Sequence, residues 1–355
     1  MPPLSNLSSI FGTSWRSHYT LSDSSDTVLT LKNPTALFAV WDEPDGVAST
    51  QSPANSSSNT PVVFRVSSQN LIQASHWFKT ALTGSWTENS DRSVSAEGWD
   101  PEAMDIVLRA VHNRTGTIPR KVTLEMLCKI AVLVDYYGLH DALHFFCAVW
   151  IDLLRNPLPT VYGRDLILWI CISSIFASTD ILNIVKKVAI EHNTGEVRTL
   201  GLPISQCVIN DVDTRRAAEL ERHIASLNLV KRNLLNGTAG CSFECRSILL
   251  GAIVQYMHNE GVEDFMRLPF KGCSVVETTK KIQEIHSPSR DWHKPTLSRS
   301  SSCSFSLSSL IKAAYQDDDD NWGFGGLING KGKKEGYKGA KKAWTETSLE
   351  DVWGI

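Results

Sequence analysis

The chain has 355 residues, 42% of them hydrophobic and 21% charged, which is enough to bury at least one sizeable core. Its 35 basic and 38 acidic residues leave a formal charge of -3, which disfavours a protein that binds nucleic acid through a generally basic surface. No apolar run approaches the ~18 residues that span a bilayer, and no basic segment followed by an apolar block marks a secretory signal. Eight scattered cysteines indicate reduced thiols rather than a disulfide framework. We therefore expect an intracellular protein, cytoplasmic or nuclear, without a membrane partner.

The first part of the chain predicts a polar terminus and three short strands. Residues 1–25 are polar and Ser-rich, a composition typical of disordered segments. Short runs of apolar and β-branched residues predict strands at residues 27–31, 37–41 and 62–66. Residues 42–60 contain Pro, Gly, Asn and several Ser without periodicity, so we expect a loop between the second and third strands.

Helical periodicity takes over after the third strand. Residues 70–82 carry Leu71, Ala74, Phe78 and Leu82 at helical spacing, which predicts one helix. A short segment around Val94 intervenes before the next helical pattern begins.

Two later helices have clear start and stop signals. Asp100 and Pro101 predict a helix start, because the Asp side chain accepts free amide hydrogens of the first turn and Pro needs no amide partner there. Thr123 can cap the next helix, and Gly138 suits its exit because glycine readily adopts the left-handed conformation. A further helix stops before Pro157, and its predicted core stripe is Leu143, Phe146, Trp150 and Leu153.

The second half of the chain predicts helices and then a tail. From residue 165 to about 257 the pattern is almost all helical, with segments beginning near Asp165, Asp180, Asp211 and Ser247. Apolar periodicity fades after about residue 269. A Ser-rich stretch, an acidic run and a Lys- and Gly-rich stretch from Lys331 to Lys342 follow. This composition predicts a disordered tail over residues 269–355.

The sequence holds no convincing catalytic or cofactor motif. Gly325, Gly330 and Lys331 match the spacing of a phosphate-binding loop, but Gly332 stands where that loop needs a Ser or Thr for Mg²⁺. Cys241 and Cys245 are four residues apart, whereas tetrahedral zinc needs four ligands in paired short spacings. We therefore expect no enzyme, no catalytic residue and no cofactor. A metal site at Cys241 and Cys245 stays open as an alternative to two small residues at the start of a helix.

Residues 64–78, FRVSSQNLIQASHWF, combine a strand end with a helix start. Phe64 and Val66 end the strand, and Leu71, Ser75 and Phe78 follow at intervals of three to four residues. This spacing places the last three residues on one helical face, where a small Ser allows close packing. The pattern resembles the signature of the BTB/POZ family.

Other segments resemble the same family in the same order. Residues 100–112 are similar to its next helix, and residues 124–143 to its following pair of helices. The sequences FAVW at residues 38–41 and KIAVLVDYY at residues 129–137 look like the fungal BTB-domain proteins. The resemblance covers roughly residues 26–265 and is strongest over residues 60–155.

The resemblance implies a fold and a function. It implies an α+β fold in which helices cap a small sheet at residues 26–155, followed by a helical region at 156–268 and the tail. Members of this family are protein-interaction modules that often self-associate, and some connect substrates to cullin-type ubiquitin ligases. We therefore expect an adaptor that forms a homodimer or a hetero-oligomer, with a cullin scaffold as one expected partner. The alternative is a nuclear transcription regulator that contacts nucleic acid through Lys331 to Lys342.

Overall fold

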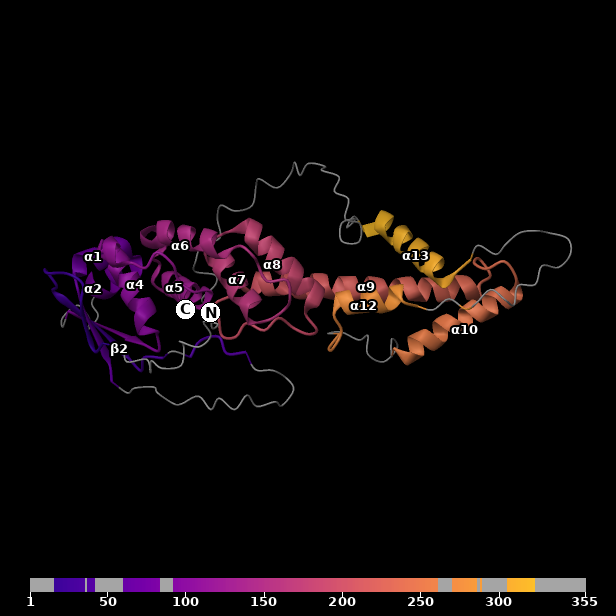
Figure 1. Ribbon diagram of the computed structural model, residues 1–355, viewed down its shortest axis with the longest axis horizontal. Helices are drawn as coiled ribbons and strands as arrows, with labels where there is room; N and C mark the ends of the chain where they lie inside the picture. Colours follow the sequence, from indigo (N-terminus) through magenta and orange to yellow (C-terminus); the bar gives the residue numbers. More distant parts are fainter. Residues whose placement is uncertain are drawn as a thin grey trace, which may run out of the picture. The chain divides into compact units, whose positions relative to one another are not determined.

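The computed structural model describes residues 16–35, 37–41, 60–83, 92–260, 270–285, 288 and 305–322. The chain divides into two units, one made of residues 1–225 and 254–286, the other of residues 226–253 and 287–355. The first unit contains a four-stranded sheet and most of the helices, so the expected mixed α+β class is confirmed (Figure 1).

The sheet has the strand order β1-β3-β2-β4. Its strands are β1 (His18–Thr20), β2 (Thr27–Lys32), β3 (Val62–Val66) and β4 (Ser93–Glu97). Strands β2 and β3 run antiparallel with Leu29 opposite Phe64, while β1 pairs with β3 and β4 pairs with β2 in parallel. Alternate residues of β2 and β3 are buried, because successive side chains of a strand point to opposite faces. The sheet therefore places one apolar face against the core.

Strand β1 and residues 37–41 both differ from the sequence prediction. The described part of the predicted polar terminus contains β1, because Tyr19 stacks on Phe64 with 4.9 Å between ring centroids and the backbone of β3 pairs with it. Residues 37–41 form no strand, although their composition predicts one. Ala39 has a φ of 46°, and Arg164 binds the carbonyls of Phe38 and Ala39 at 3.0 and 2.9 Å. These carbonyls are therefore engaged by a side chain instead of by a neighbouring strand.

The capping predictions are confirmed. The Asp100 side chain accepts the amides of Glu102 and Ala103 at the start of α4 (Pro101–Val111). Thr123 accepts the amide of Met126 at the start of α5 (Leu124–Tyr137), which ends at Gly138 with a φ of 63°. These ends depend on residues that are local in sequence, so local chemistry sufficed to predict them.

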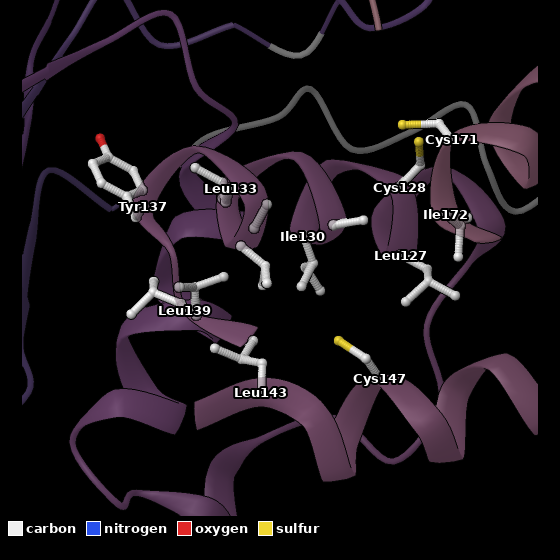
Figure 2. Packing of buried hydrophobic residues seen from close by; sticks show 14 of the residues in the cluster. Leu127, Cys128, Ile130, Leu133, Tyr137, Leu139, Leu143, Cys147, Cys171 and Ile172 are labelled. Carbon is white, nitrogen blue, oxygen red and sulfur yellow. The ribbon is translucent and has the colours of Figure 1, made fainter. Parts of the chain in front are cut away.

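Helix α5 lies at the centre of the first unit's core. It packs against α4, α6 (His140–Leu154) and α7 (Arg164–Ile175). Figure 2 shows Leu127 and Ile130 on the side of α5 that faces Cys147 of α6, and Cys128 beside Cys171 of α7. All of these side chains are fully buried. The close packing around α5 holds α6 in place and decides which α6 residues face outward.

Two helices lie inside the range predicted to be a disordered tail, so that prediction is wrong for them. They are α12 (Val275–Gln283) and α13 (Leu307–Trp322). Ser274 caps α12 through the Glu277 amide, and buried Arg216 donates to the carbonyls of Phe270 and Cys273 at 2.6 Å each. These long-range bonds order a segment whose composition alone predicts disorder. The rest of the predicted tail, including Lys331 to Lys342, lies outside the described residues.

The remaining helices follow the prediction with shifted ends. They are α8 (Thr179–His192), α9 (Gln206–Leu235) and α10 (Phe243–Asn259). Helix α9 begins five residues before the predicted Asp211 and α10 four residues before the predicted Ser247. Across the part of the chain that the structure covers, no helix has both the length and the apolar character to cross a bilayer.

Candidate interaction surface

The residues that carry the family resemblance are part of the core. Phe64 and Val66 of β3 are fully buried, as are Leu71 of α1 (Ser68–Ala74) and Phe78 of α2 (His76–Thr83). The chain passes directly from β3 into α1, as the sequence predicts. These four side chains pack the junction of strand and helix and are not placed to contact a partner.

Ser75 breaks the single helix that was predicted over residues 70–82. Its backbone is extended, with φ -146° and ψ 130°, and it separates α1 from α2. The Ser75 hydroxyl donates to the carbonyl of Tyr137 and accepts the amide of Phe78 at 3.2 Å. The single-helix prediction is wrong because the bond to Tyr137 comes from a residue 62 positions away. A window on the local sequence contains no signal for it.

His112 joins the end of α4 to the start of α1. The Ser67 amide donates to His112 Nε2 at 2.9 Å, and His112 Nδ1 lies 2.8 Å from the Leu108 carbonyl, to which it donates in this tautomer. Burial lowers the pKa of His112, and the charge of Arg114 acts in the same direction, whereas the bond to the Leu108 carbonyl opposes the shift. His112 is therefore a neutral structural residue, held by bonds at both ring nitrogens.

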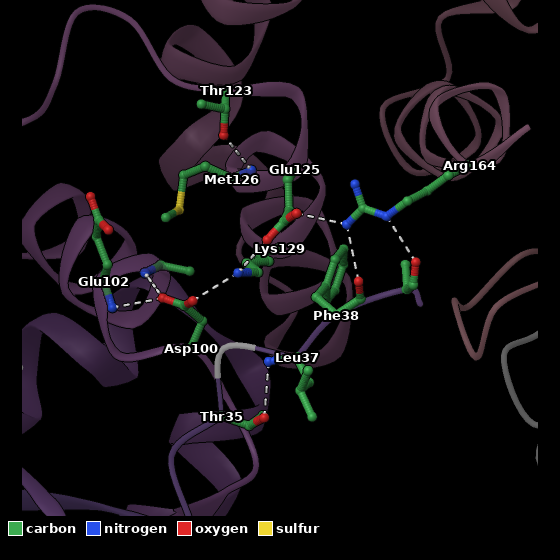
Figure 3. A network of polar contacts seen from close by, with 12 residues as sticks. Thr35, Leu37, Phe38, Asp100, Glu102, Thr123, Glu125, Met126, Lys129 and Arg164 are labelled. Carbon is green, nitrogen blue, oxygen red and sulfur yellow. Dashed lines mark hydrogen bonds and ion pairs between the residues drawn. The ribbon is translucent and has the colours of Figure 1, made fainter. Parts of the chain in front are cut away.

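Four charged side chains form one network across α4, α5 and α7 (Figure 3). Lys129 lies 2.9 Å from Asp100 and 2.8 Å from Glu125, and Arg164 lies 2.7 Å from Glu125. Burial acts to lower the pKa of Lys129, but the bonds to Glu125 and Asp100 reverse this effect and raise it. Burial likewise acts to raise the pKa of Glu125, and the bonds to Lys129 and Arg164 lower it instead.

This network balances two carboxylates against two cations. Asp100 pairs with Lys129, and Glu125 pairs with both Lys129 and Arg164. Arg164 also donates to the backbone carbonyls of residues 38 and 39. Sequence reasoning identified Asp100 only as a helix cap and missed the other three residues, which are brought together by the packing of α5. The arrangement joins elements and is not suited to acid–base chemistry.

Helix α6 carries an exposed apolar row. Phe145, Val149 and Leu153 are 72%, 40% and 53% exposed, at intervals of four residues along one face. The opposite face is buried against α5. Leu153 was predicted to belong to the core stripe, and this prediction is wrong because the buried side chains of α6 are Leu143, Cys147, Trp150 and Ile151. The helix is therefore apolar on two faces, and among the described parts of the chain only the face toward α5 is covered.

The apolar row borders a cavity of about 430 Å³. Its floor includes Trp150, whose indole N–H donates to the Pro119 carbonyl at 3.1 Å and so holds residues 115–121 beside α6. Residues 115–121 form the wall opposite α6, and Arg120 and Lys121 are exposed on it. We call this feature the α6 groove. It is lined by Thr115, Gly116, Ile118, Pro119, Arg120, Lys121, Phe145, Phe146, Val149, Trp150 and Leu153.

The remaining sequence candidates give no further site. Cys241 is exposed, whereas Cys245 is buried in α10, where the Ser242 hydroxyl accepts its amide at 3.2 Å. In the ranges that the structure covers, no three His, Cys, Asp or Glu side chains lie together in a way that could hold a metal ion. The phosphate-loop match at residues 325–332 and the Lys-rich stretch lie outside those ranges.

Comparison with known proteins adds no relative. No protein-family model matches the chain, and a search of curated proteins finds no match.

Proposed function

We propose that this chain is a non-enzymatic interaction module that binds protein partners through the α6 groove. The observation that carries this proposal is the exposed row of Phe145, Val149 and Leu153 beside a cavity of about 430 Å³. Large apolar side chains gathered on one surface and rimmed by polar residues mark interaction sites in soluble proteins.

Burial of the exposed apolar row by a partner would be energetically favourable. Fully burying one Phe, Val or Leu side chain contributes about 1.5–3 kcal/mol, so three such residues supply a substantial part of a binding free energy. Helix α6 is already held in place by its packing on α5, so it loses little conformational freedom when a partner binds to its other face. An exposed aromatic side chain such as Phe145 beside a pocket is typical of the residues that dominate interface energies.

We also propose that residues 26–155 form a BTB/POZ-type domain. Three features support this: the small sheet covered by helices, the direct passage from β3 into α1, and the buried positions of Phe64, Leu71 and Phe78. On this proposal the expected partners are a second copy of the chain or a cullin-type scaffold.

The experiment compares full-length chains that differ only in exposed apolar residues. The groove variant carries Phe145→Glu and Leu153→Glu. The control variant carries Phe243→Glu on α10, where the side chain is as exposed as that of Phe145. Light scattering across a concentration series reports self-association, binding of a purified cullin scaffold tests that partner, and quantitative affinity purification compares the captured partners.

We expect the groove variant to lose a partner that the wild-type chain and the Phe243→Glu variant both retain. If self-association, cullin binding and the captured partners are the same for all three chains, the groove is not an interaction site and the proposal fails. Unchanged thermal midpoints in the variants confirm that the loss is due to the surface and not to unfolding.

A further inference from the structure

The charges beside the α6 groove indicate which chemistry would fill it. Arg120 and Lys121 are exposed on one wall, and no Asp or Glu is among the lining residues that the structure describes. The apolar row on the other wall advances four residues, or about 6 Å, at each step along α6. A short segment with two or three apolar side chains on one face and carboxylates beside them would match both walls.

The chain itself contains such a segment. Residues 345–355 read TETSLEDVWGI, with three acidic residues and no Lys or Arg. Leu349, Val352 and Trp353 have the spacing i, i+3, i+4, which places them on one face if the segment is helical. At 3.6 residues per turn, Glu346 and Glu350 lie beside this apolar face, whereas Asp351 lies on the opposite side.

A second acidic segment of the chain fits less well. Helix α13 contains the acidic run Asp317–Asp320 and also has apolar residues at helical spacing. However, its Leu307, Ile311 and Ala314 are already buried where they are. Using them in the groove would require that packing to be lost first, whereas residues 345–355 form a separate stretch beyond α13 in the sequence.

We propose that the α6 groove binds residues 345–355 of this protein. Trp353 fills the cavity beside Phe145, and Glu346 and Glu350 pair with Arg120 and Lys121. The cavity volume of about 430 Å³ is within the range of sites that bury a small ligand, so it accommodates one indole side chain. This inference rests on the proposed function, because the segment occupies the same groove that a partner would use and competes with that partner.

The test uses a fluorescently labelled synthetic peptide of residues 345–355 and measures its anisotropy against full-length chains. The acceptor is a full-length chain with Leu349→Ala and Trp353→Ala, so that its own segment does not compete. We expect saturable binding in the micromolar range, with at least tenfold weaker binding to the wild-type chain, whose own segment occupies the groove.

Three variants of that acceptor locate the peptide. Phe145→Glu removes the apolar contact and Arg120→Glu with Lys121→Glu reverses the rim charge, and each is expected to weaken binding at least tenfold. Phe243→Glu is expected to leave binding unchanged. A peptide with Trp353→Ala is expected to bind at least tenfold more weakly, and higher salt is expected to reduce the effect of the charge reversal.

Two outcomes overturn the inference. One is no binding of the peptide at 100 μM, and the other is equal binding to the Phe145→Glu and Phe243→Glu acceptors. In either case, a partner that is lost from the groove variant in affinity purification still supports the proposed function. The experiments therefore distinguish a groove that does not bind residues 345–355 from a groove that binds no partner at all.

Discussion

The ammonium of Lys129 lies 2.9 Å from one carboxylate oxygen of Asp100, while the other oxygen of Asp100 accepts two backbone amides at the start of α4. One side chain therefore caps a helix and pairs with the neighbouring helix α5. Because Lys129 also binds Glu125, which in turn binds Arg164, the orientation of α4, α5 and α7 is coupled through a chain of charged contacts.

Substituting Lys129 tests this coupling. Lys129→Met removes one cation and leaves the carboxylate of Asp100 without its buried partner, so we expect a loss of about 3–5 kcal/mol in the free energy of unfolding. Lys187→Met removes an exposed lysine that lies 3.8 Å from Glu191, and we expect a change below about 0.5 kcal/mol. Urea denaturation measures both. Equal losses in the two variants would show that the network contributes no more than a surface pair.

Ser75 allows a test of the break between α1 and α2. Ser75→Ala deletes the donor to the Tyr137 carbonyl and the acceptor of the Phe78 amide, leaving both groups buried without this partner. We expect a loss of about 1–3 kcal/mol in the free energy of unfolding. Ser67→Ala is the matched control, because Ser67 is also buried but its side chain makes no capping bond to α1. A loss as large in the control would point to packing instead of hydrogen bonding.

The stability of the first unit depends on the protonation of His223. Burial on α9 lowers the pKa of His223 to about 4, and the charge of Arg222 acts in the same direction. In the unfolded chain the pKa is about 6.5, so protons bind the unfolded state first and stability falls as the pH drops from about 6.5 to about 4. Because the pKa of His112 is also lowered, its protonation likewise reduces stability as the pH falls.

The thermal midpoint measured from pH 7.5 to pH 4.5 checks this expectation. His223 contributes a loss of up to about 3 kcal/mol across that window, since one pKa unit corresponds to about 1.4 kcal/mol. In the His223→Gln variant, which cannot bind this proton, we expect a smaller decrease between pH 6.5 and pH 4.5. A decrease identical to that of the wild-type chain would contradict the assignment.

Thiol reactivity distinguishes the core from the surface. Cys128, Cys147 and Cys171 are fully buried, and burial raises the pKa of Cys147 to about 12 and that of Cys128 well above its ordinary value. Cys207 is exposed. At pH 8 we expect iodoacetamide to modify Cys207 in the native protein, and the three buried thiols only after unfolding, because the thiolate is the reactive form. Peptide mass spectrometry measures each site, and rapid native labelling of Cys147 would contradict the packing around α5.

The sequence alone determined features that depend on near neighbours. Asp100 with Pro101, Thr123 and Gly138 set helix ends through bonds and dihedral angles that involve residues a few positions away, and these predictions are confirmed. Strands β2 and β3 were predicted from their alternating and β-branched residues. The family resemblance also led to the junction at residues 64–78, although it did not reveal the break at Ser75.

The tertiary structure decided whatever depends on residues distant in sequence. The break at Ser75 requires the Tyr137 carbonyl, the irregular course of residues 37–41 requires Arg164, and α12 is ordered beside Arg216. The α6 groove has the same origin, because composition marks Phe145, Val149 and Leu153 as apolar but only the packing of α5 on the other face leaves them exposed. A helix that is apolar on two faces can bury either one, and the choice is made by its neighbours in space.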